Sequence, residues 1–157
     1  MAFRSRSKKI GRDGSITTGG QVQKAGLPAF RALGYGGTTT QTGTVVFNTE
    51  SFDTGGDFDL ANNRFVAPVD GIYLFWFQGL AGNNGANIDN DLAFYINGTV
   101  QTGCRVREDG PNANWNSIRT QANFELSAND QVDVRVTAGA VYNNNNIWTS
   151  FQGFLIG

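Results

Sequence analysis

The segment 71–77, Gly-Ile-Tyr-Leu-Phe-Trp-Phe, constrains the fold more than any other part of the chain. Successive side chains of a β-strand point to opposite faces. One face of this segment would carry Tyr73, Phe75 and Phe77. The other face would carry Ile72, Leu74 and Trp76. A strand with one solvated face alternates apolar with polar residues, so a strand that is apolar on both faces needs cover on two sides. The facing sheet of its own domain supplies only one of these covers.

The composition favours many short strands around an aromatic core. The chain of 157 residues contains 12 Phe, 4 Tyr, 3 Trp and 21 Gly, and its length suits one domain or one domain with an arm. No segment of helical length shows a 3.6-residue apolar period. The sequence therefore predicts an all-β fold, a two-sheet antiparallel jelly-roll sandwich of about eight to ten strands.

Apolar alternation and turn residues place the strands within the body of the chain. The predicted strands span 28–32, 44–47, 71–77, 92–96, 123–126, 132–136 and 148–156, with further strand material in 52–65. The predicted turns are Asn62-Asn63, Asn97-Gly98 and 128–130.

The charge is divided between an arm and a body. Residues 1–31 hold seven basic and one acidic residue, a net charge of +6, whereas the remainder holds five basic and twelve acidic residues, a net charge of −7. Residues 1–26 are too polar to offset their ordering entropy alone, so we expect an extended N-terminal arm that another molecule holds. A crystal contact or a fold-back onto the body at 27–157 is the alternative. The anchoring residues of this arm would be Arg4, Arg6, Lys8, Lys9 and Arg12.

The side chains needed for common enzyme chemistry are scarce. The chain has no histidine and one cysteine, Cys104, which excludes the usual serine or cysteine triad and a thiolate zinc cluster. The acidic run around Asp53 and Asp57 contains possible calcium ligands, but we interpret it as a solvated turn. Cys104 is interpreted as a half-buried strand residue. We predict no catalytic residue, no metal and no cofactor, and the sequence shows neither a signal peptide nor an apolar run long enough to cross a membrane.

Eight residues at fixed intervals carry a family resemblance. They are Phe47, Asp53, Phe58, Phe65, Gly71, Tyr73, Phe75 and Phe77, and segments 124–132 and 151–155 continue the pattern. This spacing resembles the globular head of complement component 1q and its relatives in the tumour necrosis factor superfamily, over about residues 27–157. The resemblance implies a jelly-roll protomer that assembles as a threefold homotrimer. In the family's register the trimer interface would consist of Leu74, Trp76, Phe151 and Leu155. The alternative is that the arm or a long loop covers this face within one chain.

The resemblance, with no collagen-like repeat in the arm and no signal peptide, favours a bacteriophage virion over complement recognition. The leading hypothesis is a non-enzymatic homotrimeric structural protein, made in the host cytoplasm and built into the virion. Its arm would bind the major capsid protein or a tail protein. Capsid decoration, as a cement protein or head fibre, is preferred over a tail position.

Two other functions remain open. A receptor- or carbohydrate-binding tail fibre module would recognise a host-surface glycan through loops 81–90, 105–116 and 139–147, with Trp115 stacking on a sugar ring. An enzyme would need two Asp carboxylates across a cleft, of which the sequence gives no sign. Nucleic acid is a disfavoured partner, because Phe3 is the arm's only stacking aromatic and the body is acidic.

Overall fold

The computed structural model describes most of the body and parts of the arm. The described residues are 9–10, 16–18, 21–23, 26–34, 36–81, 89–108, 116–144 and 148–157. Every regular element in them is a β-strand, and every pairing is antiparallel. The predicted all-β, antiparallel jelly-roll sandwich is therefore confirmed.

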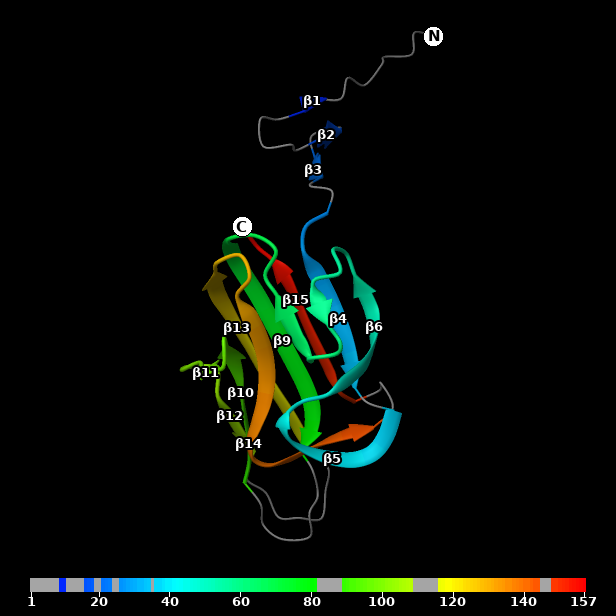
Figure 1. Cartoon of the computed structure of the whole chain (residues 1–157), viewed down its shortest axis with the longest axis vertical. Coiled ribbons are helices and arrows are strands. Elements are labelled where there is room, and N and C mark those ends of the chain that lie inside the picture. Colours follow the sequence, from blue (N-terminus) through cyan, green and yellow to red (C-terminus); the bar gives the residue numbers. More distant parts are fainter. Residues whose placement is uncertain are drawn as a thin grey trace.

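One layer of the sandwich, sheet 1, has the strand order β13-β9-β15-β4-β6 (Figure 1). Its strands are β4 (Ala29–Gly34), β6 (Phe47–Asp53), β9 (Gly71–Ala81), β13 (Ser117–Leu126) and β15 (Ser150–Leu155). The segment singled out by its two apolar faces forms the first part of β9. It has a strand on each side, β13 and β15, along its length.

The other layer, sheet 2, is built around β14 (Gln131–Asn144), the longest strand. On one side β14 pairs with β10 (Asn90–Ile96), which also pairs with β11 (Thr99–Val100) and β12 (Val106–Glu108). On the other side it pairs with β5 (Gly36–Thr44) and β8 (Arg64–Val66), and β8 pairs with β7 (Phe58–Asp59). The layers join where Val141 and Tyr142 of β14 pair with the end of β9, which makes one continuous sheet of twelve strands.

Aromatic side chains fill the space between the layers. Tyr73, Phe75 and Phe77 are fully buried, as the alternation along β9 predicts. Phe30 of β4 lies at the centre, with its ring centroid 5.0 Å from that of Phe65 and 4.9 Å from that of Phe151. Such aromatic pairs contribute about 0.5–1.5 kcal/mol each beyond the area they bury. The core therefore stabilises β9 through one face only.

The three predicted turns are present and rest on asparagines in the left-handed region. The backbone φ angles are 56° at Asn63, 50° at Asn97 and 75° at Asn129. Asn97 is followed by Gly98 with φ of 80°, the two-residue pattern of a type I′ hairpin between β10 and β11. The Asn97 amide also donates a hydrogen bond to the Asp130 carboxylate at 2.7 Å, so the two turns support each other.

The strand predictions near the N-terminal end of the body are partly wrong. The first strand runs to Gly34, two residues beyond its predicted end, and an additional strand, β5, begins at Gly36 and ends at Thr44, where a strand was expected to begin. Val45 and Val46 belong to no strand, although Val45 is buried and its amide donates to the Val134 carbonyl at 2.9 Å. The glycines of this segment disfavour a strand, whereas its β-branched threonines favour one, and pairing with β14 brings the whole segment into the sheet.

The described part of the arm consists largely of β-strands. Its described residues form three short antiparallel strands, β1 (Lys9–Ile10), β2 (Ile16–Thr18) and β3 (Gln21–Gln23). These strands pair only with one another, and Figure 1 shows them beyond one end of the body.

Sheet 2 contains a buried carboxylate, Asp91, that is held by Arg105. The Arg105 guanidinium donates to both Asp91 oxygens, at 2.7 and 2.8 Å from Nε, and the Thr137 hydroxyl donates at 3.0 Å. The hydrogen bond from Arg105, helped by Thr137, holds the pKa of Asp91 below its ordinary value.

Gly153 provides a test of core packing, because it faces the core between two aromatic rings. A Cβ at this position would lie 2.5 Å from a Phe75 ring atom and 2.9 Å from a Phe30 ring atom. We expect Gly153→Ala to lower the free energy of unfolding by about 1–3 kcal/mol, measured by denaturant titration. Gly157→Ala, where a Cβ meets nothing, is the control. Equal stability of the two variants would contradict this packing.

Asp91 predicts a pH dependence of stability. Because its folded-state pKa is lowered, its contribution is present above the unfolded pKa of about 4 and is lost as pH falls through the folded pKa. Asp57 and Glu50, whose pKa values are raised by burial and by Asp53, act in the opposite direction and offset part of this loss. We expect Asp91→Asn to reduce stability at pH 7 by about 1–2 kcal/mol, discounted because Arg105 is exposed, and to flatten the acid limb of a melting-temperature profile.

The control for this effect is Asp89→Asn. Asp89 pairs with Arg107, but its side chain is half exposed. An exposed pair contributes little, so the control should melt close to the parent protein. Unchanged acid sensitivity in Asp91→Asn would show that this carboxylate is not responsible.

Candidate functional site

The outer face of sheet 1 carries the largest exposed apolar side chains of β9 and β15. Ile72 is 47% exposed, Trp76 42% and Phe154 48%. Leu74 lies between them, partly buried, and the strand register places Phe154 directly opposite it. We call these four residues, Ile72, Leu74, Trp76 and Phe154, the apolar patch. A Trp or Phe offers about 150–250 Å² in all, and these side chains are a little under half exposed, so the exposed patch amounts to roughly 300 Å².

The prediction that Phe151 and Leu155 belong to this face is wrong. The register pairs Phe151 with Phe77 and Leu155 with Tyr73, so both side chains point into the core. Phe151 is fully buried, Leu155 is 9% exposed, and both belong to the core cluster. Because Gly153 also takes a core position, the residues of β15 on the outer face are Ser150, Gln152 and Phe154.

Leu74 and Trp76 do lie on the outer face, as the alternation along β9 requires. Their place in a trimer interface stays a prediction. Phe154 was missed, although two phenylalanines three residues apart on one strand must lie on opposite faces. This odd separation along the strand was the sequence signal that could have placed Phe154 on the outer face.

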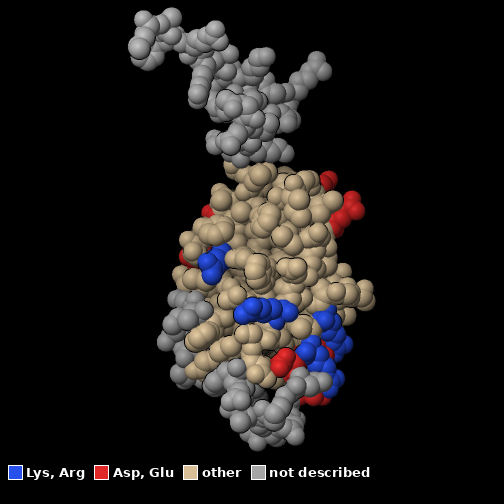
Figure 2. Space-filling view, turned by 180° about the vertical axis from the view of Figure 1, so that it is seen from behind, with Lys and Arg blue, Asp and Glu red and all other residues tan. Residues whose placement is uncertain are grey.

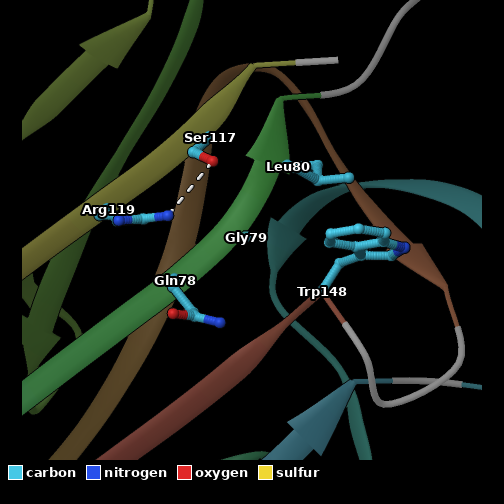
Figure 3. A pocket seen from close by; sticks show the side chains of 6 residues that line it. All are labelled: Gln78, Gly79, Leu80, Ser117, Arg119 and Trp148. Carbon is cyan, nitrogen blue, oxygen red and sulfur yellow. Dashed lines mark hydrogen bonds between the residues drawn. The ribbon is translucent and has the colours of Figure 1, made fainter.

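The apolar character of the outer face gives way to polar side chains farther along β9. The register places Gln121 and Gln152 on either side of Trp76, and Arg119 beside Gln78. A hollow of about 250 Å³ is lined by Trp76, Arg119, Thr120 and Gln121. A second cleft, of about 160 Å³, is lined by Gln78, Gly79, Leu80, Ser117, Arg119 and Trp148 (Figure 3).

The arginines of the two sheets differ in their partners. Four arginines in sheet 2 or its loops form ion pairs with aspartates: Arg64 with Asp59, Arg105 with Asp91, Arg107 with Asp89 and Arg135 with Asp133. Arg31 of β4 and Arg119 of β13 have no carboxylate partner among the described residues. Both lie on the outer face of sheet 1, where the exposed carboxylate of Glu125, opposite Ile72, forms an ion pair with neither of them.

Both carboxylate oxygens of Asp53, in the acidic turn, accept hydrogen bonds from backbone amides. One Asp53 oxygen accepts from the amides of Gly55 and Gly56, at 3.1 and 2.9 Å, and the other accepts from the Phe58 amide at 2.8 Å. This supports the interpretation of the run as a turn. Within the described ranges, no three Cys, Asp or Glu side chains gather as a metal site requires.

Cys104 is more enclosed than expected. It is 4% exposed, lies outside any strand, and its thiol donates to the Gln101 carbonyl at 3.4 Å. The prediction of a half-buried strand residue is therefore wrong, because this segment turns the side chain into the core cluster.

Several predicted contact residues lie outside the described part of the structure. These are Arg4, Arg6, Lys8, Arg12 and Trp115, together with the side chain of Lys9. Of the loops proposed to bind sugar, residues 82–88, 109–115 and 145–147 are outside it as well.

The surface shows no broad basic area on the face in Figure 2. Most of the described surface there carries no charge, and where basic side chains gather at one side, acidic side chains lie beside them. Among the described residues there is also no helix with the length and apolarity of a membrane span.

Known proteins share this domain. The chain is 25% identical to complement C1q tumor necrosis factor-related protein 3 of Mus musculus and 23% identical to that of Homo sapiens, each over 118 residues, or 75% of this chain. The chain spans about half the length, 46%, of these relatives.

Two solved structures have the same fold. The globular domain of zebrafish complement 1qA protein aligns with a TM-score of 0.63 and 20% identity, covering 83% of this chain and 98% of that one. Murine APRIL aligns with a TM-score of 0.66 and 16% identity, covering 83% of this chain and 99% of that one. The C1q domain family matches residues 29–156, which include every strand of both sheets, and the chain therefore belongs to the C1q domain family.

Proposed function

We propose that this chain is a non-enzymatic homotrimeric structural protein of a bacteriophage virion, anchored by its arm and exposed on the particle surface. The apolar patch on sheet 1 is the observation that carries the proposal, because the body leaves it uncovered. Capsid decoration, as a cement protein or head fibre, is the position we favour over the tail.

The patch supports assembly on energetic grounds. Soluble monomers rarely expose contiguous apolar surface of several hundred Å² without a function for it. At about 25 cal/mol per Å², burial of the patch contributes several kcal/mol per protomer before the cost of association. Domains of this family are usually homotrimeric, so other copies of the chain are the best candidate for the missing cover.

The arm supports anchoring to a separate molecule. Its strands pair with one another and with no strand of the body. Its charge is opposite to that of the acidic body, which suits a basic segment held by an acidic partner and a body that stays in solvent. A major capsid protein or a tail protein is the partner we propose.

The virion location rests on the arm and not on the named relatives. The chain matches about half of those proteins, and only in the domain they share. Residues 1–26 form a basic, Gly/Ser-rich segment. We infer synthesis in the host cytoplasm followed by incorporation into the particle.

The trimer is tested by placing a charge in the patch. We expect Trp76→Asp to shift the protein from trimer to monomer or aggregate in sedimentation velocity, because a carboxylate buried without a partner costs several kcal/mol. Phe154→Asp, on the neighbouring strand, should act in the same way.

The matched control is Val100→Asp. Val100 is 43% exposed on β11, in sheet 2 and away from the patch, so this variant should remain trimeric. A trimer that survives both Trp76→Asp and Phe154→Asp would rule out this face as the interface.

The anchoring role is tested by deleting residues 1–26. The body should remain a folded trimer, since its sheets and core lie within residues 29–156, but it should no longer appear in purified particles. Incorporation is measured by complementing a phage that lacks the protein and probing the particles with an antibody. Incorporation at the full-length level would overturn the arm's role without affecting the trimer.

A further inference from the structure

We propose that the cleft between Arg119 and Trp148 binds a saccharide that carries a carboxylate on its ring. The cleft lies where the outer face of β9 and β13 turns polar, and it requires neither the apolar patch nor the arm. Its polar and aromatic lining is Gln78, Ser117, Arg119 and Trp148 (Figure 3).

Arg119 supplies the charge preference. Its only described hydrogen bond is a donation to the neutral Ser117 hydroxyl at 3.5 Å, the long limit for such a bond, whereas four arginines elsewhere in the body form ion pairs. A guanidinium forms shorter and stronger bonds to a carboxylate, often through two parallel N–H donors. The cleft thus presents a guanidinium that has no carboxylate partner among the described residues, which favours an anionic ligand.

Trp148 supplies the preference for a ring. Its side chain is 49% exposed at the cleft and lies beside Leu80, opposite the side from which Arg119 and Ser117 approach (Figure 3). An exposed tryptophan offers a broad apolar surface with one polar edge, which suits the C–H face of a pyranose. The Gln78 amide and the Ser117 hydroxyl supply donors and acceptors for ring hydroxyls.

The size of the cleft limits the ligand to one sugar unit at a time. Its volume of about 160 Å³ is below the 300–1,000 Å³ of pockets that enclose drug-sized ligands. The hollow of about 250 Å³ that shares Arg119 is lined by Trp76, which the proposed trimer covers, so the cleft alone holds the ligand. This arrangement is suited to one acidic unit within an oligosaccharide.

The cleft differs from the sugar site expected from sequence. That prediction used Trp115 and three loops, whereas the cleft is built from side chains on β9 and β13 and from Trp148 just before β15. Strands hold the donors in fixed positions, which reduces the ordering cost of binding.

The test measures binding of full-length protein to two acidic probes by isothermal titration calorimetry and ligand-observed NMR. The probes are sialyllactose, compared with lactose, and a glucuronic acid disaccharide, compared with its carboxyl-reduced form. We expect at least one acidic probe to bind at least tenfold more tightly than its neutral counterpart, as the loss of a charge-assisted hydrogen bond requires. Comparing the two acidic probes identifies which acidic sugar is preferred.

Variants locate the binding in the cleft. Arg119→Gln and Trp148→Ala should each weaken binding of the acidic probe at least tenfold, and Arg119→Lys should retain part of it. The matched controls are Arg107→Gln, an exposed arginine of sheet 2, and Phe52→Ala, an aromatic 48% exposed on β6 at the far edge of sheet 1. Both controls should bind as the parent protein does.

Three results would overturn the proposal. They are no binding of either acidic probe, equal binding of acidic and neutral probes, and binding that the Arg119 and Trp148 variants leave unchanged. Displacement of the sugar by inorganic phosphate at equal concentration would show a general anion site and reject the ring preference. Sedimentation of each variant distinguishes weakened sugar binding from loss of the trimer, because the cleft variants should keep the parent's oligomeric state.

Discussion

The structure depends on a strand that is apolar on both of its faces. β9 lies in the interior of sheet 1, and its inward side chains are held by the aromatic cluster around Phe30 and Phe75. Its outward side chains, Ile72 and Trp76 among them, remain nearly half exposed. One layer of protein satisfies only half of what this strand requires, so the same sequence that drives folding also leaves a surface that favours association.

The sequence was sufficient for the parts of the fold that local chemistry determines. The alternation of β9 identified Tyr73 and Phe75 as core residues, and asparagines in the left-handed region formed turns where they were expected, as at Asn97. Strand boundaries around β5 were not predictable in this way, because its glycines suggest a turn and its polar threonines show no apolar alternation. Pairing with β14 makes this segment a strand.

The candidate site, like the fold, has features that local sequence determines and features that tertiary pairing determines. Leu74 and Trp76 followed from strand periodicity, but the family's register predicts the wrong face for Phe151, which shares the parity of the core positions of β15. The cleft at Arg119 had no sequence signal. It depends on which arginines find an aspartate nearby in space, as Arg105 finds Asp91 from fourteen residues away, and such pairing appears only once the sheets are assembled.

The outer face of sheet 1 therefore combines two kinds of unsatisfied surface in one plane. Toward one end β9 presents Ile72, Leu74 and Trp76, whose cover must be apolar, and toward the other it presents Gln78 beside Arg119, which has no carboxylate partner in the described part of the chain. Successive outward residues on a strand are about 6.6–6.8 Å apart, so the change from apolar to polar occurs within one side-chain spacing. A protomer that buried the whole face would remove the charged Arg119 guanidinium from water, which is costly without a counter-charge. Association through the apolar end, with the polar end left to solvent or to an anionic ligand, satisfies both halves of the face at once.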